Sequence, residues 1–281
     1  MCSVFDISES GYYHWLKNKG KPTARELLSV EIQKVLDEHP DNDNYGVKRM
    51  KSALEQRGVF KSLRTVRRAM KEMGIIHPKR KPHGITKATT EIQEQENLIK
   101  RDFTAEKPLE KLLSDITEIQ CADGKLYVSA VLDCYSGEIL SVAMDDNMKK
   151  ELCIRTVDEL RLQYGNDKLS GAIFHSDRGS QYTSEAFKKA LSDAGLVQSL
   201  SGTGHCYDNA RMESFFATLK KEKIYKIPAY KLTREQVKSI VFRYIFVYYN
   251  RIRVSSFNPG GLAPVKYREW ETATVAKSTS A

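Results

Sequence analysis

Three acidic residues have the type and the sequence context that metal-dependent chemistry on a phosphate ester requires. Asp115 lies in the strand-like run EKLLSDITEIQ, Asp177 follows the apolar run GAIFH, and Glu213 lies in the segment YDNARMESFFATLKKEKIY. Mg²⁺ takes oxygen ligands, usually one or two protein carboxylates together with substrate oxygens. Two such ions, held by about three carboxylates, can assist an in-line displacement at phosphorus. Each residue alone is weak evidence, since an Asp beside Gly and Ser, as at position 177, is also ordinary turn chemistry.

The elements around these residues predict an α/β domain with a mixed sheet. Three strand-like runs, 110–120, 125–133 and 138–145, are joined by the turn signals Asp123-Gly124 and Ser136-Gly137, which indicates an antiparallel meander. An amphipathic helix over 149–165, a buried strand at 171–175, a second helix over 184–195 and a strand at 196–200 follow. Ligands gather at strand ends in such sheets, and Asp177 lies at one.

The segment with Glu213 predicts a helix that begins at a cap formed by Asp208 or Asn209. Glu213 and Lys220 lie two turns apart on a face next to the apolar one, so their side chains project together. The apolar face consists of Met212, Phe215, Phe216 and Leu219.

Four regions follow from the composition along the chain. Residues 1–76 are helical, 77–97 lose hydrophobic periodicity and predict a linker, 98–270 form the α/β core, and 271–281 are small and polar, which is typical of a disordered tail. Within the core, Thr233 and Gln236 form a capping box before a long helix. Its apolar stripe is Val237, Ile240, Val241, Tyr244, Ile245 and Tyr248.

The N-terminal region reads as three short helices, over 24–39, 45–58 and 62–74, with Gly58 and Gly74 at the expected C-terminal caps. The third begins at Ser62 as N-cap and carries the predicted DNA contacts Arg64, Arg67 and Arg68. Such a basic helix suits the second helix of a helix-turn-helix pair against phosphates, although a solvated basic face is the equally weighted alternative. The formal charge of +9, from 45 Lys and Arg against 36 Asp and Glu, makes a polyanionic partner plausible.

Other classes are excluded by the composition. No run approaches the roughly 18 apolar residues that a membrane helix needs, so we expect a soluble protein that binds no membrane. A disulfide framework and a structural zinc site are both disfavoured, because the cysteines are odd in number and scattered, without a C-x-x-C pair. They are Cys2, Cys121, Cys134, Cys153 and Cys206.

The spacing of the carboxylates makes the interpretation specific. There are 61 residues between Asp115 and Asp177, and 35 between Asp177 and Glu213. This pattern resembles the D-D-35-E core of retroviral-integrase-like transposases, and most closely the second-frame transposase of the insertion-sequence-three family. The motifs ISESGYYHWLK, YGVKRMKSAL and RTVRRAMKEMGI are similar to that family's N-terminal helix-turn-helix segment. The catalytic motifs that match are SDITEI, HSDRGSQYTS and SLSGTGHCYDNARMESFFATLKKE.

The resemblance implies a ribonuclease-H-like fold in which Asp115, Asp177 and Glu213 are the catalytic and metal-binding residues. Two Mg²⁺ ions are expected, with Mn²⁺ as a substitute. The implied activity is metal-dependent strand cleavage followed by 3′-hydroxyl strand transfer, that is, DNA integration and recombination of a bacterial insertion sequence. The implied DNA contacts in the core are Lys220, Arg178, His175 and Gln181.

The same resemblance implies the partners and the place of action. The partner is double-stranded DNA, both the element ends and the target, bound by a homodimer or higher multimer. The upstream-frame product, separate or as a fusion, is a further partner. The implied location is the cytoplasm, with the protein on the nucleoid when bound to DNA. Two alternatives remain: a ribonuclease-H-like nuclease that only hydrolyses, and a non-catalytic DNA-binding regulator of transposition.

Overall fold

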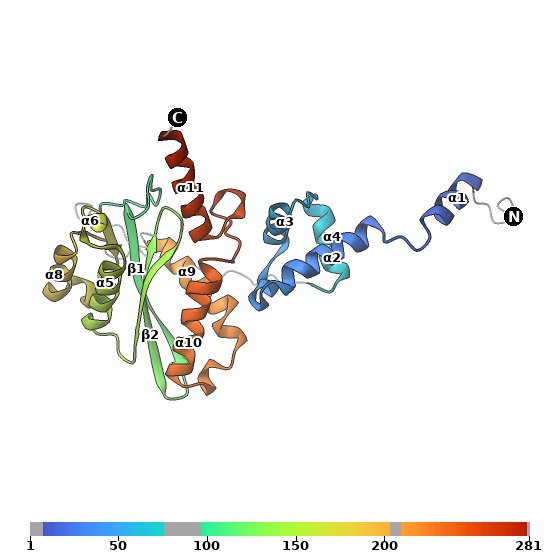
Figure 1. The fold of residues 1–281 in the computed structure, drawn as a ribbon. Helices are drawn as coiled ribbons and strands as arrows, with labels where there is room; N and C mark the ends of the chain where they lie inside the picture. The colour runs from blue at the N-terminus through green and yellow to red at the C-terminus, as the bar shows by residue number, and fades with distance from the viewer. Residues whose placement is uncertain (1–7, 76–96, 203–208, 280–281) are drawn as a thin grey trace. The chain divides into compact units, whose positions relative to one another are not determined.

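The computed structural model describes residues 8–75, 97–202 and 209–279, with the backbone alone from 272 onward. The chain forms two compact units, residues 1–79 and 80–281, which we describe separately (Figure 1). The division falls inside the predicted linker 77–97, whose residues up to 96 lie outside the described ranges. In the described ranges, no helix has both the length and the apolar composition needed to cross a bilayer.

The first unit contains the three predicted helices and one more. These are α1 (Glu9–Asn18), α2 (Ala24–Asp37), α3 (Val47–Gln56) and α4 (Leu63–Glu72), with a 3₁₀ turn at Pro40–Asn44. The predicted cap of α4 is confirmed, since the Ser62 hydroxyl accepts the Thr65 N–H at 3.2 Å. Gly58 and Gly74 have φ values of +78° and +74°, the left-handed conformation that glycine adopts without strain. Helices α2, α3 and α4 bury their apolar faces together, with Ile32, Met50, Leu54, Val66 and Met70 at their centre.

A five-stranded mixed sheet organises the second unit, as the sequence predicts. Its strands are β1 (Lys111–Cys121), β2 (Gly124–Asp133), β3 (Ile139–Asp145), β4 (Ile173–Ser176) and β5 (Val197–Leu200), in the order β3-β2-β1-β4-β5. The first three form the antiparallel meander, while β1, β4 and β5 run parallel. This order and these directions are those of a ribonuclease-H-like sheet, which confirms the fold class.

Helices cover the sheet and close its core. One group consists of α5 (Lys150–Tyr164), α6 (Asn166–Leu169), α7 (Ser180–Thr183) and α8 (Glu185–Asp193). Its buried side chains, including Val157, Phe187 and Leu191, pack on Leu112 and Phe174 of the sheet. Helices α9 (Ala210–Glu222) and α10 (Arg234–Arg243) lie on the other side of β1 and β2 in Figure 1. Short 3₁₀ turns occupy Ile224–Lys226, Ala229–Lys231 and Pro259–Gly261.

The C-terminal elements agree with the sequence at their start and differ toward the end. The capping box of Thr233 and Gln236 opens α10 as predicted. The long helix does not stay regular, however, because Tyr244–Tyr249 form a π-helical turn. The disordered tail expected from 271 also differs from the structure, in which α11 runs over Pro264–Thr279. Small residues such as those in ETATVAKST tolerate a helix, so polarity alone did not define the end of the fold.

Candidate active site

The pairing of β1 with β4 brings the two aspartates to one place. The parallel register joins Lys111 to Ile173 and continues to Leu113 with His175. The pairing ends there, so Asp115 lies two residues beyond it on β1 and Asp177 lies two residues beyond it after β4. Asp115 lies within β1 and is partly buried, while Asp177 follows the last residue of β4 and is exposed.

Three charged side chains, Asp177, Glu213 and Lys220, act electrostatically on Asp115. Burial, followed by the negative charges of Asp177 and Glu213, raises the pKa of Asp115 from 3.8 to about 7. A hydrogen bond from the Ile116 N–H, at 2.8 Å, and the Lys220 ammonium act in the opposite direction. The two acids and the lysine that the sequence predicted to act with Asp115 therefore lie close enough to alter its ionisation.

Helix α9 carries Glu213 and Lys220 toward the two aspartates. Glu213 lies in the first turn of the helix, where the positive end of the helix dipole favours an anion. Its side chain is exposed, and partial desolvation raises its pKa. The neighbouring apolar face of α9 is buried as predicted, through Met212, Phe215, Phe216 and Leu219.

The turn after β4 holds Asp177 in a defined place. The Gly179 N–H donates to Asp177 Oδ1 at 3.0 Å, so the ordinary turn interpretation of this residue is also correct. A Cβ at Gly179 would lie 2.8 Å from Gln181 Oε1 and 3.1 Å from Asp177 Oδ1. A side chain at this position would therefore require the Gln181 side chain to move and would crowd the carboxylate of Asp177.

His175 does not reach the surface, which contradicts its predicted contact with DNA. The ring is fully buried, with Nδ1 at 2.8 Å from the Ser199 hydroxyl and Nε2 at 3.1 Å from the Ser201 hydroxyl. Both ring nitrogens thus join β4 to β5 and to the residue after it. His175 lies within β4 and is fully buried, whereas Asp177 follows the strand and is exposed, so nearness in sequence did not give the two side chains the same environment.

The two other predicted contacts near Asp177 remain at the surface. Arg178 is partly exposed and donates from Nε to the Ser201 carbonyl at 2.8 Å. Gln181 donates to the Met148 carbonyl at 2.9 Å and lines a shallow pocket with Lys149 and Lys150. Their backbone contacts shape the loop around Asp177, and their contact with DNA stays a prediction.

Two positioning contacts beside the carboxylates were missed by the sequence analysis. Asn209 precedes α9, but within the described residues its side chain does not cap that helix. It donates instead to the Ser114 carbonyl at 2.8 Å. The Ser114 hydroxyl also lies 3.1 Å from the Tyr182 hydroxyl. The contacts join positions 95 and 68 residues apart, so local sequence patterns carried no signal for them.

The C-terminal end of α9 is fixed by a buried ion pair. Glu222 accepts two hydrogen bonds of 2.8 Å from Arg253 and one of 2.9 Å from the Tyr244 hydroxyl. Asn250 bonds both the N–H and the carbonyl of Ile139, at 3.0 and 2.9 Å, on the first residue of β3. The segment after α10 therefore packs against α9 and the sheet and helps hold the helix that carries Glu213.

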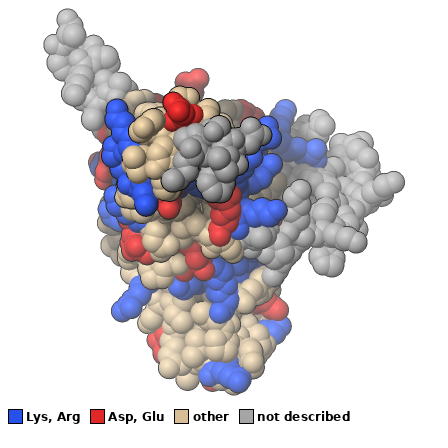
Figure 2. Space-filling view, turned by 90° about the vertical axis from the view of Figure 1, so that its right-hand side faces the viewer, with Lys and Arg blue, Asp and Glu red and all other residues tan. Residues whose placement is uncertain are grey.

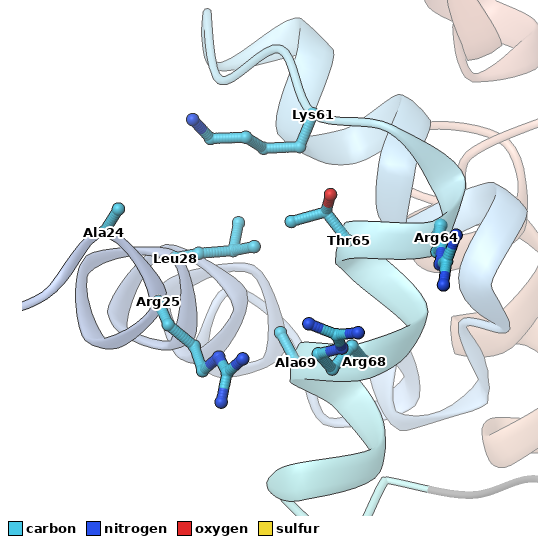
Figure 3. Close-up of a pocket in the computed structure, with 8 residues that line it drawn as sticks. All are labelled: Ala24, Arg25, Leu28, Lys61, Arg64, Thr65, Arg68 and Ala69. Carbon is cyan, nitrogen blue, oxygen red and sulfur yellow. The ribbon is translucent and has the colours of Figure 1, made fainter.

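The predicted DNA-binding arginines of the first unit lie on the surface of α4. Arg64, Arg67 and Arg68 are all exposed, and Val66 and Met70 face the core. Arg64 and Arg68 line an open pocket between α2 and α4, as Figure 3 shows, and Arg67 does not. The same pocket receives Lys61 and Arg25, so it is rich in cationic side chains. The face shown in Figure 2 mixes basic and acidic side chains.

No three His, Cys, Asp or Glu side chains stand together as a ready metal site within the part of the chain that the structure describes. The donor chemistry nevertheless fits a hard divalent cation, because Asp115, Asp177 and Glu213 offer carboxylate oxygens, and burial and the charges of the latter two raise the pKa of Asp115. Partial burial and nearby negative charges disfavour the ionised form of a carboxyl group, and a bound cation would favour that form.

Comparison with known proteins places these features in a family. Integrase core domain families match residues 105–206 and 213–271, and an HTH-like domain matches 23–83. The HTLV-2 integrase catalytic core in complex with magnesium is 15% identical to this chain, with a TM-score of 0.42 over 58% of this chain and 97% of that one.

Two relatives extend over nearly the whole chain. The "Insertion element IS600 uncharacterized 31 kDa protein" of Shigella sonnei is 33% identical over 274 residues, which are 96% of this chain and 97% of that protein. The transposase InsF for insertion sequence IS3A of Escherichia coli K12 is 31% identical over 271 residues, which are 95% and 92% of the two chains. The chain belongs to this IS3 family of insertion-sequence transposases, with an HTH-like domain followed by an integrase core.

Proposed function

We propose that Asp115, Asp177 and Glu213 are the catalytic carboxylates of a polynucleotidyl transferase. They would cleave DNA at the ends of the element and join the freed 3′ hydroxyl to a target strand. The observation that supports this most directly is the electrostatic influence of Asp177, Glu213 and Lys220 on Asp115, together with a β1–β4 pairing that ends two residues before each aspartate. Asp115 comes from β1 and Asp177 from the turn directly after β4, while Glu213 and Lys220 come from α9. The proposed site therefore combines side chains of the sheet region and of a helix that packs on it.

In this proposal the three carboxylates hold two Mg²⁺ ions, for which Mn²⁺ can substitute. When bound, the ions supply Lewis-acid chemistry that lowers the pKa of water or of a 3′ hydroxyl. Asp115 and Asp177 would coordinate one or both of these ions through their carboxylate oxygens. Glu213 is exposed on α9, and rotation of its long side chain allows it to complete the second site. Lys220, two turns further on, neutralises a phosphate oxygen beside the reacting bond.

The DNA partner is double-stranded, and it meets basic side chains on both units. In the core, Arg178 and Gln181 border the loop that presents Asp177. In the first unit, Arg64, Arg67 and Arg68 project from α4 into solvent. Phosphate contacts of this kind supply affinity and register, while base contacts supply specificity. We propose that α4 binds the element ends.

We further propose that the protein acts as a homodimer or a higher multimer on DNA, since two element ends must be joined to one target. The upstream-frame product, separate or fused, would take part in that assembly. The cytoplasm, where the nucleoid is accessible, is the proposed location. Light scattering of the protein with and without duplex DNA would measure the change in assembly.

The test uses duplex DNA that carries the element's own terminal sequences. Asp177→Asn should abolish Mg²⁺-dependent cleavage and joining and leave DNA binding nearly unchanged. Asp167→Asn, an exposed aspartate on α6, is the matched control and should retain activity. Cleavage without joining by the parent protein would favour the hydrolytic nuclease, and binding without cleavage would favour the regulator. Full activity of Asp177→Asn would exclude the proposed site.

A further inference from the structure

One buried serine contacts the chain segments of all three carboxylates. Ser114 directly precedes Asp115 in β1 and is 1% exposed. Its hydroxyl and its carbonyl each bond a different part of the fold. Neither contact belongs to the strand ladder, whose last β1–β4 pair is Leu113 with His175. The two contacts therefore begin where the pairing of β1 with β4 ends, while the pairing of β1 with β2 continues.

The first contact reaches the segment that follows Asp177. The Ser114 hydroxyl lies 3.1 Å from the hydroxyl of Tyr182, which belongs to α7. The Tyr182 ring is 1% exposed and packs edge-on against Phe187 of α8, with 5.2 Å between the ring centroids. Because this packing fixes the ring, the tyrosine hydroxyl is a rigid anchor for β1, five residues beyond Asp177.

The second contact reaches the segment that leads into Glu213. Asn209 is 5% exposed, and its Nδ2 donates to the Ser114 carbonyl at 2.8 Å. Asn209 stands immediately before α9, four residues before Glu213. One turn of helix is therefore all that separates this bond from the carboxylate, so the bond fixes the start of α9 against β1.

We propose that Asn209, Ser114 and Tyr182 form a positioning network that sets the mutual placement of Asp115, Asp177 and Glu213 for divalent-cation binding. The inference rests on the proposed function of those carboxylates. Like charges repel, so three carboxylates converge only where other contacts hold their segments together. A hydrogen bond between neutral groups, placed one residue from Asp115, does this without adding charge at the site. Asn209, Ser114 and Tyr182 contact neither DNA nor cation in this role, and they act through the carboxylates.

The structure offers a matched control for Asn209. Asn258 is also buried, at 4% exposure, and its Nδ2 donates to the Ser136 and Leu262 carbonyls at 3.0 and 3.1 Å. In both asparagines Oδ1 has no hydrogen-bond partner within the described part of the chain. Asn258 lies in the loop before α11 and binds the turn after β2, not a carboxylate segment. Asn209→Ala and Asn258→Ala thus remove similar bonds with different expected consequences.

The experiment measures Mn²⁺ binding to the full-length metal-free protein by electron paramagnetic resonance, with melting temperature and DNA affinity in parallel. Both variants should lower the melting temperature. Asn209→Ala alone should raise the Kd for Mn²⁺ about fivefold to tenfold, the effect of losing one hydrogen bond. It should also reduce cleavage at saturating DNA without changing DNA affinity. A Kd for Mn²⁺ in Asn209→Ala equal to that of Asn258→Ala would overturn the proposal.

A second pair of variants covers the case in which Asn209→Ala fails to fold. Ser114→Ala and Tyr182→Phe each remove one hydroxyl and keep the packing, so each should raise the Kd for Mn²⁺, and the double variant should add little. Ser141→Ala is their control, because this buried serine of β3 bonds the Thr156 carbonyl at 2.9 Å, away from the carboxylates. Purely additive effects, or equal effects in Ser141→Ala, would also overturn the proposal.

The outcomes separate this inference from the proposed function. If the parent binds Mn²⁺ and Asp177→Asn does not, the carboxylate site stands, and the comparison of Asn209 with Asn258 decides the network. If Asp177→Asn binds Mn²⁺ as the parent does, the proposed site fails, and the positioning role fails with it.

Discussion

Asp115→Asn is expected to stabilise the metal-free protein at neutral and alkaline pH and to remove its stabilisation by Mg²⁺. In the folded protein, burial and the charges of Asp177 and Glu213 raise the pKa of Asp115 from 3.8 to about 7. Asparagine has nearly the same shape and can still accept the Ile116 N–H through its oxygen. The substitution therefore removes the charge and keeps the local geometry.

The sign and size of the effect follow from the pKa. A carboxyl with a raised pKa takes up a proton in the folded state between about pH 4 and pH 7, where the unfolded chain does not. The parent is thus most stable, with respect to this group, below pH 4 and loses that stability as the pH rises through 7. At about 1.4 kcal/mol for each pH unit, the loss amounts to at most about 4 kcal/mol. It is an upper limit because Asp115 is only partly buried.

Calorimetric unfolding in EDTA at pH 4, 6 and 8 would measure this effect. Asp115→Asn should match the parent near pH 4 and exceed its stability increasingly toward pH 8. Excess Mg²⁺ should then stabilise the parent and leave the variant unchanged, because binding to the native state is what shifts the equilibrium.

A control with the opposite sign is available in the same unit. Hydrogen bonds from Lys111 and Thr104 lower the pKa of Asp102, so Asp102→Asn should reduce stability at pH 8 and matter less as the solution becomes acidic. Lower stability of Asp115→Asn than of the parent at pH 8 in EDTA would refute the reasoning that the ionised Asp115 carboxylate lowers the free energy of unfolding of the metal-free protein.

Two further predictions concern the ion pair and the DNA contacts. Glu222→Gln leaves Arg253 buried without its charge partner and should cost about 3–5 kcal/mol in urea unfolding. Glu185→Gln breaks only an exposed pair with side-chain exposures of 47% and 87%, and a cost above about 1 kcal/mol there would contradict the distinction. Lys220→Ala and Arg68→Ala should each reduce the salt dependence of DNA binding by about one phosphate contact, measured as the slope of log K against log salt. An unchanged slope would remove that residue from the interface.

The sequence predicted the regular elements well because their signals are local. The capping box at Thr233, the glycine caps at Gly58 and Gly74, and the turns at Asp123 and Ser136 each depend on residues within one turn of the chain. The spacing of Asp115, Asp177 and Glu213 added the long-range information, through its resemblance to a family. The β1–β4 register and the coupling of these acids are consistent with that prediction.

The interpretations that failed depended on tertiary contacts. His175 is two residues from Asp177 in sequence, but it lies within β4, where its ring is buried between the hydroxyls of Ser199 on β5 and Ser201 just after it. Asn209 was one of two predicted helix caps, since asparagine favours that role. Its side-chain amide instead donates to the Ser114 carbonyl on β1. Most of the apolar stripe from Val237 to Tyr248 is buried, although Ile240 is only partly buried, and the π-helical turn inside the stripe left no periodic signal.

The offset between β1 and β4 has a consequence for how such genes can change over generations. Inserting one residue within β1, between Leu113 and Asp115, would turn Asp115 to the opposite face and separate it from Asp177. Inserting residues near Met148 or Gly171, between the elements that separate the two strands, would leave the pairing intact. The length of the 61-residue interval can therefore change among descendants by insertions in its loops. Natural selection then acts on the register of β1 with β4 and not on the number of residues between the two aspartates.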